Sequence, residues 1–249
     1  MLDKELTRES LAEQVAKSLR EYIYNSMEPD DMLPSTAALG KEYNVSRIVI
    51  REALKYLEAQ DIIEVANGKR AKVKPISSSI LRDFFHRATL YEKKTLLELL
   101  EVRRGIEIES ARLAAMRRNE EEVAQMKTII EEMKTIVEEM NKHLSSPESF
   151  AELDLTLHQT IAKATRNSML IYLVETIREA QEETILEGLY SRFNKGNYLG
   201  IQAYHADIVA AIEAQNPEEA QQAMVAHFTH AEKAVGYEIT SMTRENEEA

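Results

Sequence analysis

Three histidines and one aspartate in the C-terminal two thirds of the chain have the residue types and spacing for metal chemistry. Asp154 and His158 are four positions apart, so on a helix both side chains leave the same face. His205 and His227 each fall on the apolar stripe of a later helical segment. Imidazole and carboxylate ligands in this ratio suit Zn²⁺, Ni²⁺ or Mn²⁺ better than Ca²⁺ or Mg²⁺.

A single inward histidine is more often a satisfied core residue than a ligand. Three of them beside a carboxylate would be costly to bury without partners, and one divalent cation would satisfy all four groups at once. The sequence therefore predicts a divalent metal site, with zinc expected and nickel or manganese as alternatives. No separate general base accompanies these ligands in the sequence, so no catalytic residue is expected.

The segments that must position these four side chains all show helical periodicity. Asn119 followed by three glutamates, and Asn216 followed by Pro217, are predicted helix starts. The predicted helices run to about 116, from 119 to a break at Ser145-Ser146-Pro147, from 150 to 164, from 167 to 186, from 198 to 214 and from 216 onward, with a loop over 190–197. This part of the chain is predicted to be an all-α antiparallel bundle of six or seven helices.

The N-terminal third predicts a second kind of unit. Helical spacing indicates a helix over about 8–25, a break at Pro29 and a short helix over about 35–43. Asn44 tolerates the left-handed backbone of a tight turn, and Ser46 suits the N-cap of a third helix. Two helices joined by so short a turn are typical of a helix-turn-helix.

The third predicted helix has two different faces. Its apolar stripe is expected to face the core, whereas its basic stripe is expected to face DNA, where helix N-terminal residues meet base edges and phosphates. The apolar stripe consists of Ile50, Ala53, Leu54 and Leu57, and the basic stripe of Arg47, Arg51 and Lys55.

A basic hairpin is predicted directly after this helix. Asn67-Gly68 separates two strand-like runs, 62–65 and 70–73, and Asn-Gly is the strongest short hairpin signal. The basic side chains of its tip and second strand are expected to contact phosphates or enter the minor groove. They are Lys69, Arg70, Lys72 and Lys74. The fold class is therefore mainly α: a winged helix-turn-helix of three helices and a β-hairpin wing, followed by the helical bundle.

Charge is distributed unevenly along the 249 residues. Residues 1–75 carry 12 Lys/Arg and 13 Asp/Glu (−1) and the remainder 19 and 30 (−11), which together give the net charge of −12. Residues 41–75 alone carry a net +3, so only this region is expected to approach DNA. We predict a DNA-binding domain over 1–75, a linker and the start of the first bundle helix over 76–92, an effector, metal and dimerisation domain over 93–240, and a polar tail over 241–249.

The cellular setting follows from composition. The chain has no cysteine, its N-terminus has no apolar signal core, and no stretch approaches ~18 uninterrupted apolar residues. A cytoplasmic protein without a membrane partner is therefore expected.

Over residues 8–75 the chain resembles the GntR family of bacterial transcription regulators. The motifs that carry the resemblance are Leu33-Pro34-Ser35, Val45-Ser46-Arg47, Ile50-Arg51-Glu52-Ala53-Leu54 and Asn67-Gly68. The resemblance implies that Arg47 and Arg51 contact operator DNA and that Gly68 lets the wing backbone approach the groove. The predicted DNA-binding residues are Ser46, Arg47, Ile48, Val49, Arg51, Asn67, Gly68 and Lys69.

The chain departs from that family pattern at Ala37, Ile48 and Val49, where polar residues are common in the family. The methyl groups of Ile48 and Val49 suit thymine methyls better than hydrogen-bonding base edges. Because alanine at position 37 lacks a polar group for a DNA contact, one half-site alone is expected to bind weakly. Specific binding is therefore expected to need a dimer.

Over residues 93–235 the chain resembles the metal-binding, FCD-type effector domain of the FadR subfamily. The metal quartet, the Glu101-Val102-Arg103 segment and Asn167 carry this resemblance. It implies a pocket in which the metal and Arg103 hold a small carboxylate metabolite, and a guanidinium can grip a carboxylate by two hydrogen bonds. The alternative for Arg103 is an ion pair with Glu107 or Glu101.

Arg178 on the fourth bundle helix and Asn167 complete the predicted effector-binding set. The expected effector is a hydroxy acid, a sugar acid or a di- or tricarboxylate. An acyl-CoA is disfavoured, because the family members that bind acyl-CoA lack this metal set.

The function predicted from these features is a ligand-responsive transcription regulator, a repressor, that binds a palindromic double-stranded operator as a homodimer and is not an enzyme. Two alternatives remain open at this point: a metal-dependent hydrolase with a DNA-binding appendage, and a metal that only staples the bundle. The sequence leaves open the effector, the native metal, the operator and the direction of the ligand response.

Overall fold

The computed structural model describes residues 9–66, 69–91, 93–142, 144–180, 186 and 200–231. The chain divides into two compact units, residues 1–80 and residues 81–249. Each unit has its own hydrophobic cluster, so each is described by itself.

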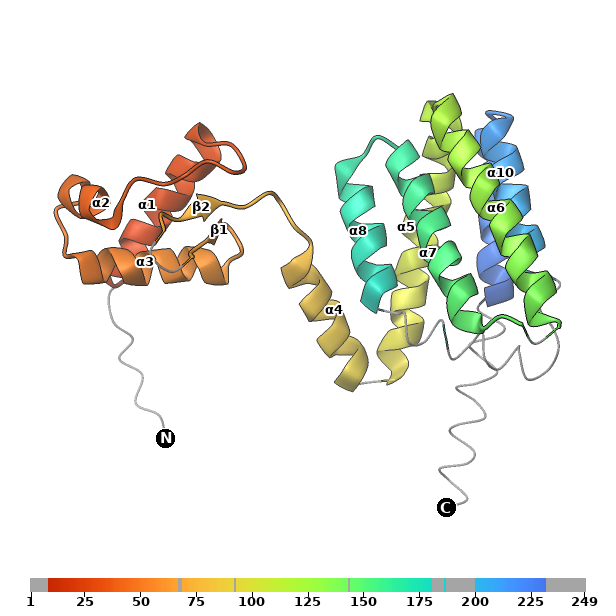
Figure 1. Cartoon of the computed structure of the whole chain (residues 1–249), viewed down its shortest axis with the longest axis horizontal. Coiled ribbons are helices and arrows are strands. Elements are labelled where there is room, and N and C mark those ends of the chain that lie inside the picture. The colour runs from red at the N-terminus through yellow and green to blue at the C-terminus, as the bar shows by residue number, and fades with distance from the viewer. Residues whose placement is uncertain are drawn as a thin grey trace, which may run out of the picture. The chain divides into compact units, whose positions relative to one another are not determined.

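The first unit contains three helices and a small antiparallel sheet (Figure 1). Its elements are α1 (Leu11–Ser26), α2 (Thr36–Glu42), α3 (Arg47–Ala59), β1 (Ile63–Glu64) and β2 (Lys72–Val73). Ser10, Ser35 and Ser46 cap the three helices through their side-chain oxygens, which accept backbone N–H groups of the first turn. The predicted helix-turn-helix with a wing is confirmed.

The inner face of α3 forms the centre of this unit. Ile50, Ala53 and Leu57 are fully buried and Leu54 is nearly so, as the apolar stripe predicted. They pack in one cluster with residues of α1, including Leu19. Because the complete apolar stripe is buried, the rotation of α3 about its axis is fixed, and so are the side chains that it exposes to solvent.

The turn between α2 and α3 depends on backbone freedom. Asn44 has a φ of 51°, the left-handed conformation expected for it. Gly40 accepts a hydrogen bond from the Val45 N–H at 3.0 Å, and a Cβ at Gly40 would lie 3.1 Å from the Val45 carbonyl oxygen. The tight approach of the two helices therefore favours glycine at this point.

The wing strands pair in the register Ile63 with Val73 and Glu64 with Lys72. The paired segment is shorter than the predicted strands of four residues each. Asn67 and Gly68, at the predicted tip, lie outside the described residues. A β-bridge from Met32 to Lys72 ties the wing to the segment before α2.

In the described residues of the second unit all regular secondary structure is helical, and the predicted all-α class is confirmed (Figure 1). Its bundle helices are α5 (Lys93–Arg117), α6 (Glu120–Met140), α7 (Pro147–Ala164), α8 (Ser168–Ala180), α10 (Ile201–Glu213) and a helix over 217–231. The predicted loop over 190–197 and most of the predicted extension of the fourth helix to 186 lie outside the described residues. Within the described part, every helix is too short or too polar to cross a bilayer.

The bundle core is apolar around a polar centre. Met126 and Met133 of α6, Leu157 of α7, Ile208 of α10 and Phe228 of the last described helix are fully buried in one cluster. Helix starts are fixed as predicted for α6, where Asn119 and Glu122 form a reciprocal capping box. A rigid apolar frame therefore surrounds the polar side chains described below.

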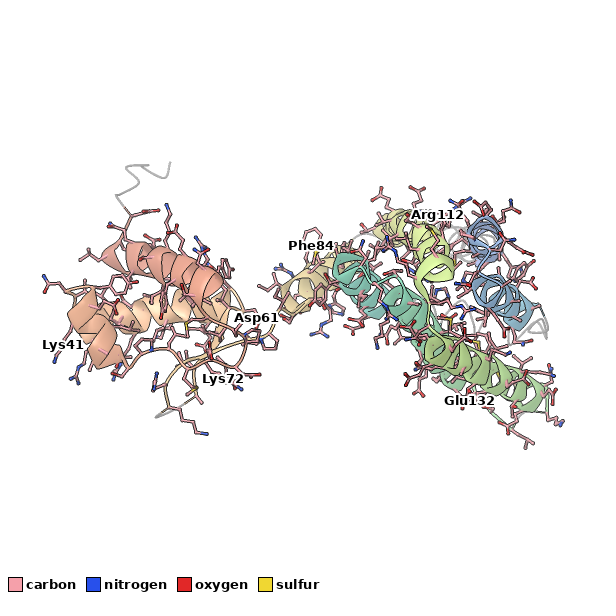
Figure 2. All side chains as sticks on the ribbon, turned by 90° about the horizontal axis from the view of Figure 1, so that it is seen from above. Lys41, Asp61, Lys72, Phe84, Arg112 and Glu132 are labelled. Carbon is pink, nitrogen blue, oxygen red and sulfur yellow. The ribbon has the colours of Figure 1, made fainter. Side chains whose placement is uncertain are left out.

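The helix α4 (Ser79–Tyr91) follows the winged-helix unit. Arg82 Nη1 lies 2.9 Å from Glu179 Oε2 of α8, whereas Phe84 remains 56% exposed (Figure 2). Within the described residues, α4 is thus held to α8 by an ion pair rather than by burial of this phenyl ring.

Asp61 lies where the winged-helix unit leads into α4 (Figure 2). Its carboxylate accepts hydrogen bonds from Lys74 Nζ and Ser77 Oγ, and from Ser79 Oγ at 2.6 Å. These donors lower the pKa of Asp61 from its ordinary value of 3.8 to about 2. The start of α4 is therefore tied to the end of α3 by one ionised side chain.

Candidate metal centre and DNA interface

The outer face of α3 presents the predicted basic residues. Arg47, Arg51 and Lys55 are exposed on the side opposite the buried stripe, and Ile48 is 69% exposed. Val49 packs against the core cluster and is half-buried. Ile48 therefore has more exposed surface than Val49 for contact with a DNA groove. Ser46 Oγ accepts the Val49 N–H at 3.3 Å, so its capping role is visible in the fold.

Three of the four predicted wing charges, those of Arg70, Lys72 and Lys74, have partners within the unit, and their contact with phosphates stays a prediction. Arg70 donates to the Leu33 and Met32 carbonyl oxygens at 2.6 and 3.0 Å. Lys72 Nζ lies 2.5 Å from Asp30 Oδ1, and Lys74 pairs with Asp61. Sequence periodicity could not reveal these pairs, because each joins residues from separate parts of the chain.

Lys69 keeps an exposed side chain next to the wing tip. Its backbone N–H donates to the Ala66 carbonyl oxygen at 3.0 Å. Asn67 and Gly68, the other predicted DNA contacts here, lie outside the described residues.

In the bundle, the structure brings Asp154, His158, His205 and His227 together from three helices. One ligand atom from each lies within 4.8 Å of every other. Asp154 and His158 come from adjacent turns of α7, His205 from α10, and His227 from the helix over 217–231. His158 and His205 are 1% and 0% exposed, and the other two are below 10%, so the cluster lies in the bundle interior.

The three imidazole rings face a common centre. Ring centroids are 5.5 Å apart for His158 and His205, 5.1 Å for His158 and His227, and 4.5 Å for His205 and His227. Burial lowers the pKa of His158 and, well below its usual range, that of His227. Both rings are therefore neutral at pH 7, which is the form that ligates a metal.

Two arginines and a glutamate surround the cluster. Glu107 of α5 accepts from Arg103 Nε at 2.7 Å through Oε1, and its Oε2 contacts His158 Nδ1 and lies 3.4 Å from Arg178 Nη1. Arg178 Nη2 bonds Asp154 Oδ2. The ion pair with Glu107 that the sequence left open for Arg103 is thus present.

Both buried carboxylates stay ionised. Burial by itself would raise the pKa of Glu107, but Arg103, His158 and Arg178 bring that pKa well below its usual range. Burial likewise opposes ionisation of Asp154, and Arg178 with the two nearest histidines brings its pKa well below normal. The centre therefore holds two fixed negative charges and two fixed positive charges.

This donor set fits a divalent ion. His158 Nε2 is buried and makes no hydrogen bond, since Asp154 Oδ1 at 3.6 Å is beyond hydrogen-bond range. Two nitrogen ligands on opposite sides of an ion are about 4.2 Å apart, so donors spread over 4.8 Å need to move inward only slightly. Asp154, His158, His205 and His227 would hold the ion.

Asn167 is placed differently from the metal ligands. Its side-chain oxygen accepts the Met169 and Leu170 N–H groups at 3.1 and 3.4 Å, so it caps α8. It follows the C-terminal end of α7, whose last residue, Ala164, is roughly 9 Å along the helix axis beyond His158. Its predicted contact with an effector stays a prediction.

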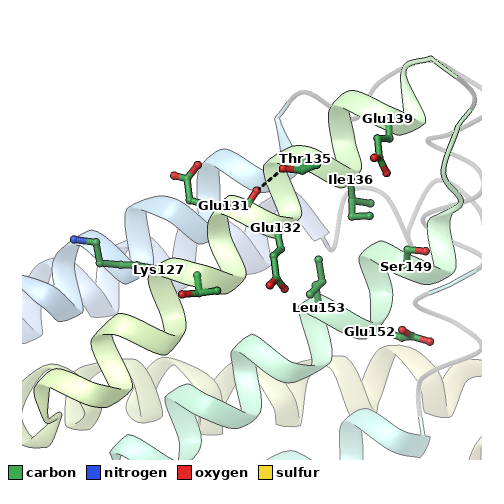
Figure 3. Close-up of a pocket in the computed structure, with 10 residues that line it drawn as sticks. Lys127, Glu131, Glu132, Thr135, Ile136, Glu139, Ser149, Glu152 and Leu153 are labelled. Carbon is green, nitrogen blue, oxygen red and sulfur yellow. Dashed lines mark hydrogen bonds between the residues drawn. The ribbon is translucent and has the colours of Figure 1, made fainter.

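An open groove lies elsewhere, on the outer surface of α6 and α7 (Figure 3). Glu131, Glu132, Glu139 and Glu152 line it around the apolar Ile136, together with other residues of the same two helices. Four carboxylates repel an anion, so a carboxylate effector is not expected there.

Glu107 is the member of the centre that the sequence prediction missed as a site residue. It lies four positions after Arg103, on the same inward stripe of α5. An inward carboxylate beside an inward guanidinium was a usable signal. What the sequence could not show is that this stripe meets His158 of α7 and Arg178 of α8.

A winged helix joined to a helical bundle with a buried histidine–aspartate centre defines a DNA-binding protein with a sensory domain. The comparisons with known proteins agree. The family model described as bacterial regulatory proteins, gntR family, matches residues 11–73, and the FCD domain model matches residues 98–230. The chain belongs to the GntR family and carries an FCD domain; it is a ligand-responsive, DNA-binding transcription regulator and not an enzyme.

Curated relatives extend over most of the chain. The HTH-type transcriptional regulator LutR of Bacillus subtilis is 31% identical over 220 residues, 85% of this chain and 94% of that protein. The Glc operon transcriptional activator of Escherichia coli K12 is 29% identical over 91% of this chain and 89% of its own length. The transcriptional repressor NanR of E. coli is 24% identical over 90% and 83%.

Among solved structures, Streptococcus agalactiae GntR is similar with a TM-score of 0.66 at 20% identity, covering 90% of this chain and 99% of its own. This likeness supports the fold. The two family matches together leave the hydrolase alternative without support.

Proposed function

We propose that the protein is a homodimeric repressor that binds a palindromic operator in the cytoplasm and senses a small carboxylate through a divalent metal, zinc being the first candidate. DNA binding is assigned to residues 1–75, with 76–92 as the link to the effector and dimerisation domain over 93–240 and a polar tail over 241–249. The proposed metal ligands are Asp154, His158, His205 and His227.

The observation that carries the sensing proposal is the charge balance of the centre. Asp154 and Glu107 are offset by Arg103 and Arg178, so the charges of these four buried side chains sum to zero. A divalent ion would add two positive charges in the bundle interior. Because uncompensated buried charge is costly, the loaded site favours a small anion at the open positions of the metal. A carboxylate with one or two further oxygens, as in a hydroxy acid, sugar acid or dicarboxylate, meets this need.

Arg103 is the proposed effector contact from the protein. Its Nε bond to Glu107 and its position 5.3 Å from the centroid of the Phe228 ring fix the guanidinium. A guanidinium that is already held loses little conformational entropy when it binds a carboxylate.

The DNA half of the proposal rests on the outer face of α3. Arg47 and Arg51 are the proposed contacts to bases and phosphates, with Ile48 against a thymine methyl. The internal pairs of Arg70, Lys72 and Lys74 reduce the charge that the wing can offer to phosphates. Two copies reading a palindrome make up for a weak half-site.

Release from DNA on effector binding is the proposed direction. The relative NanR is named a repressor and the Glc operon relative an activator. A promoter–reporter assay distinguishes the two directions, because deletion of a repressor raises expression and deletion of an activator abolishes it.

The sensing proposal is tested by thermal denaturation of the full chain, first metal-free, then with Zn²⁺, Ni²⁺ or Mn²⁺, then with a panel of small carboxylates. We expect one carboxylate class to raise the melting temperature only when metal is present, and Arg103→Ala to remove that second increase. Arg112→Ala is the matched control on α5, because Arg112 pairs with Glu109 at the surface. A metal that merely staples the bundle would raise stability with no carboxylate effect, and that result would overturn the sensing role.

A further inference from the structure

The two oxygens of Asp154 face different partners. Oδ1 lies 2.8 Å from His205 Nε2 and 3.6 Å from His158 Nε2, on the side of the histidine cluster. Oδ2 is bonded by Nη2 of Arg178, whose side chain is fully buried. Only one oxygen of this carboxylate is therefore directed to the metal position.

The two nitrogens of His158 are divided in the same way. Nδ1 contacts Glu107 Oε2, whereas Nε2 faces the metal position. A carboxylate at Nδ1 favours the tautomer with its proton there, which leaves the lone pair of Nε2 for a metal. Glu107 thus selects the ligating nitrogen of His158.

One guanidinium connects the two arrangements. Arg178 directs Nη2 to Asp154 and Nη1 to Glu107, at 3.4 Å from its Oε2. Because these groups come from α5, α7 and α8 and are buried, the bracket formed by Arg178 and Glu107 is a fixed part of the bundle core. It touches the metal ligands from the side away from the metal position.

We propose that Arg178 and Glu107 are positioning residues that limit Asp154 to one metal bond and His158 to its Nε2, and so keep coordination positions open for the effector. The proposal rests on the metal site of the proposed function. It gives Arg178 a role through Asp154, in place of the direct effector contact predicted from the sequence.

One consequence distinguishes a positioning role of Arg178 from direct contact between Arg178 and the effector. Without the guanidinium, Asp154 Oδ2 becomes available, and a carboxylate can then bind the metal through both oxygens. In the metal-loaded protein the second oxygen would take a coordination position that water would otherwise fill. Arg178→Gln should therefore lower the number of metal-bound waters before any effector is added, which an effector contact would not do.

The experiment uses the full chain loaded with Mn²⁺, an ion that favours octahedral coordination and relaxes the protons of its bound waters. We expect Arg178→Gln to bind Mn²⁺ at least as tightly as wild type and to give lower water-proton relaxivity at saturation. Arg112→Gln is the matched control, because Arg112 pairs with Glu109 at the surface of α5 and its loss leaves the Arg178–Asp154 pair in place. Its relaxivity should equal that of wild type.

Glu107→Gln tests the second proposed positioning residue. We expect about a 10- to 100-fold loss of Mn²⁺ affinity, the usual cost of removing a partner of a ligating histidine. Arg178→Met provides a second variant should Arg178→Gln fail to fold, because it also removes the partner of Asp154 Oδ2, and its lower relaxivity would support the proposal equally.

The possible outcomes are distinct. Equal relaxivity for wild type and folded Arg178 variants would overturn the positioning role while leaving the metal site in place. Absence of Mn²⁺, Ni²⁺ and Zn²⁺ binding to wild type would overturn the metal site itself, and the positioning role with it.

Discussion

Removal of one histidine from the centre, His227→Ala, should abolish the stabilisation of the bundle by metal. His227 is buried, its pKa is lowered by burial, and its ring centroid is 4.5 Å from that of His205. A neutral imidazole in that position offers a ligand at pH 7 without first losing a proton. His230→Ala is the matched control, because His230 lies on the same helix and packs against Tyr204, with ring centroids 4.8 Å apart.

The size of the effect follows from linkage. At a free metal concentration 100 times the dissociation constant, binding stabilises the folded state by about 2.7 kcal/mol. For a unit of this size, 1 kcal/mol moves the melting temperature by roughly 2–4 °C, so the wild-type shift is about 5–11 °C. Should loss of one ligand weaken binding about 100-fold, the same metal concentration gives only about 0.4 kcal/mol, or roughly 1–2 °C.

The assay is thermal denaturation of the full chain followed by circular dichroism, with chelator and then with added Zn²⁺. The shift on adding metal is the quantity compared, so any change in metal-free stability caused by the substitution cancels. We expect the wild-type shift in His230→Ala and almost none in His227→Ala. A full shift in His227→Ala would refute the assignment of this residue as a ligand, and an equal loss in both variants would show that the metal acts elsewhere.

Three further perturbations follow from the fold. Arg51→Ala should weaken operator binding by about 1–3 kcal/mol, and Lys55→Ala by less, in fluorescence anisotropy on DNA selected from a random pool; equal losses would contradict base contact by Arg51. Because the pKa of Asp61 is about 2 in the fold, its ionised form stabilises the protein above pH 4, and this contribution is lost as the pH falls through 2. The stability difference between wild type and Asp61→Asn should thus be about 1–2 kcal/mol at pH 7 and vanish near pH 2, whereas a constant difference would show that ionisation is irrelevant. Asn119→Ala should lower the melting temperature of the bundle through a loss of about 1 kcal/mol, because it removes the cap of α6, and an unchanged melting curve would contradict that role.

The parts of the fold that sequence predicts well are those governed by local spacing. The stripe from Ile50 to Leu57 had to be buried on one side of α3, because helical geometry places those residues on one face. Ser46 and Asn119 cap the helices at which they were expected, because capping depends only on neighbouring backbone groups. Local rules therefore gave the elements and their inner faces.

What local rules could not give is which buried faces meet. The proximity of Asp154 and His158 is a property of one helix, but their meeting with His205 depends on how α7 and α10 pack. The bracket of Glu107 and Arg178 joins residues 71 positions apart, so periodicity within either helix holds no information on it. The wing shows the same limit, since Lys72 of β2 pairs with Asp30 in the turn after α1.

The most direct test of the central claim is operator binding measured with and without metal and carboxylate together. The full chain is titrated onto its selected DNA by fluorescence anisotropy in four states: metal-free, metal alone, carboxylate alone and both. We predict that only the combined state changes the affinity, lowering it as a repressor requires, and that His158→Ala loses this response while binding DNA as wild type does. A carboxylate response that survives in metal-free protein or in His158→Ala would contradict sensing through the metal.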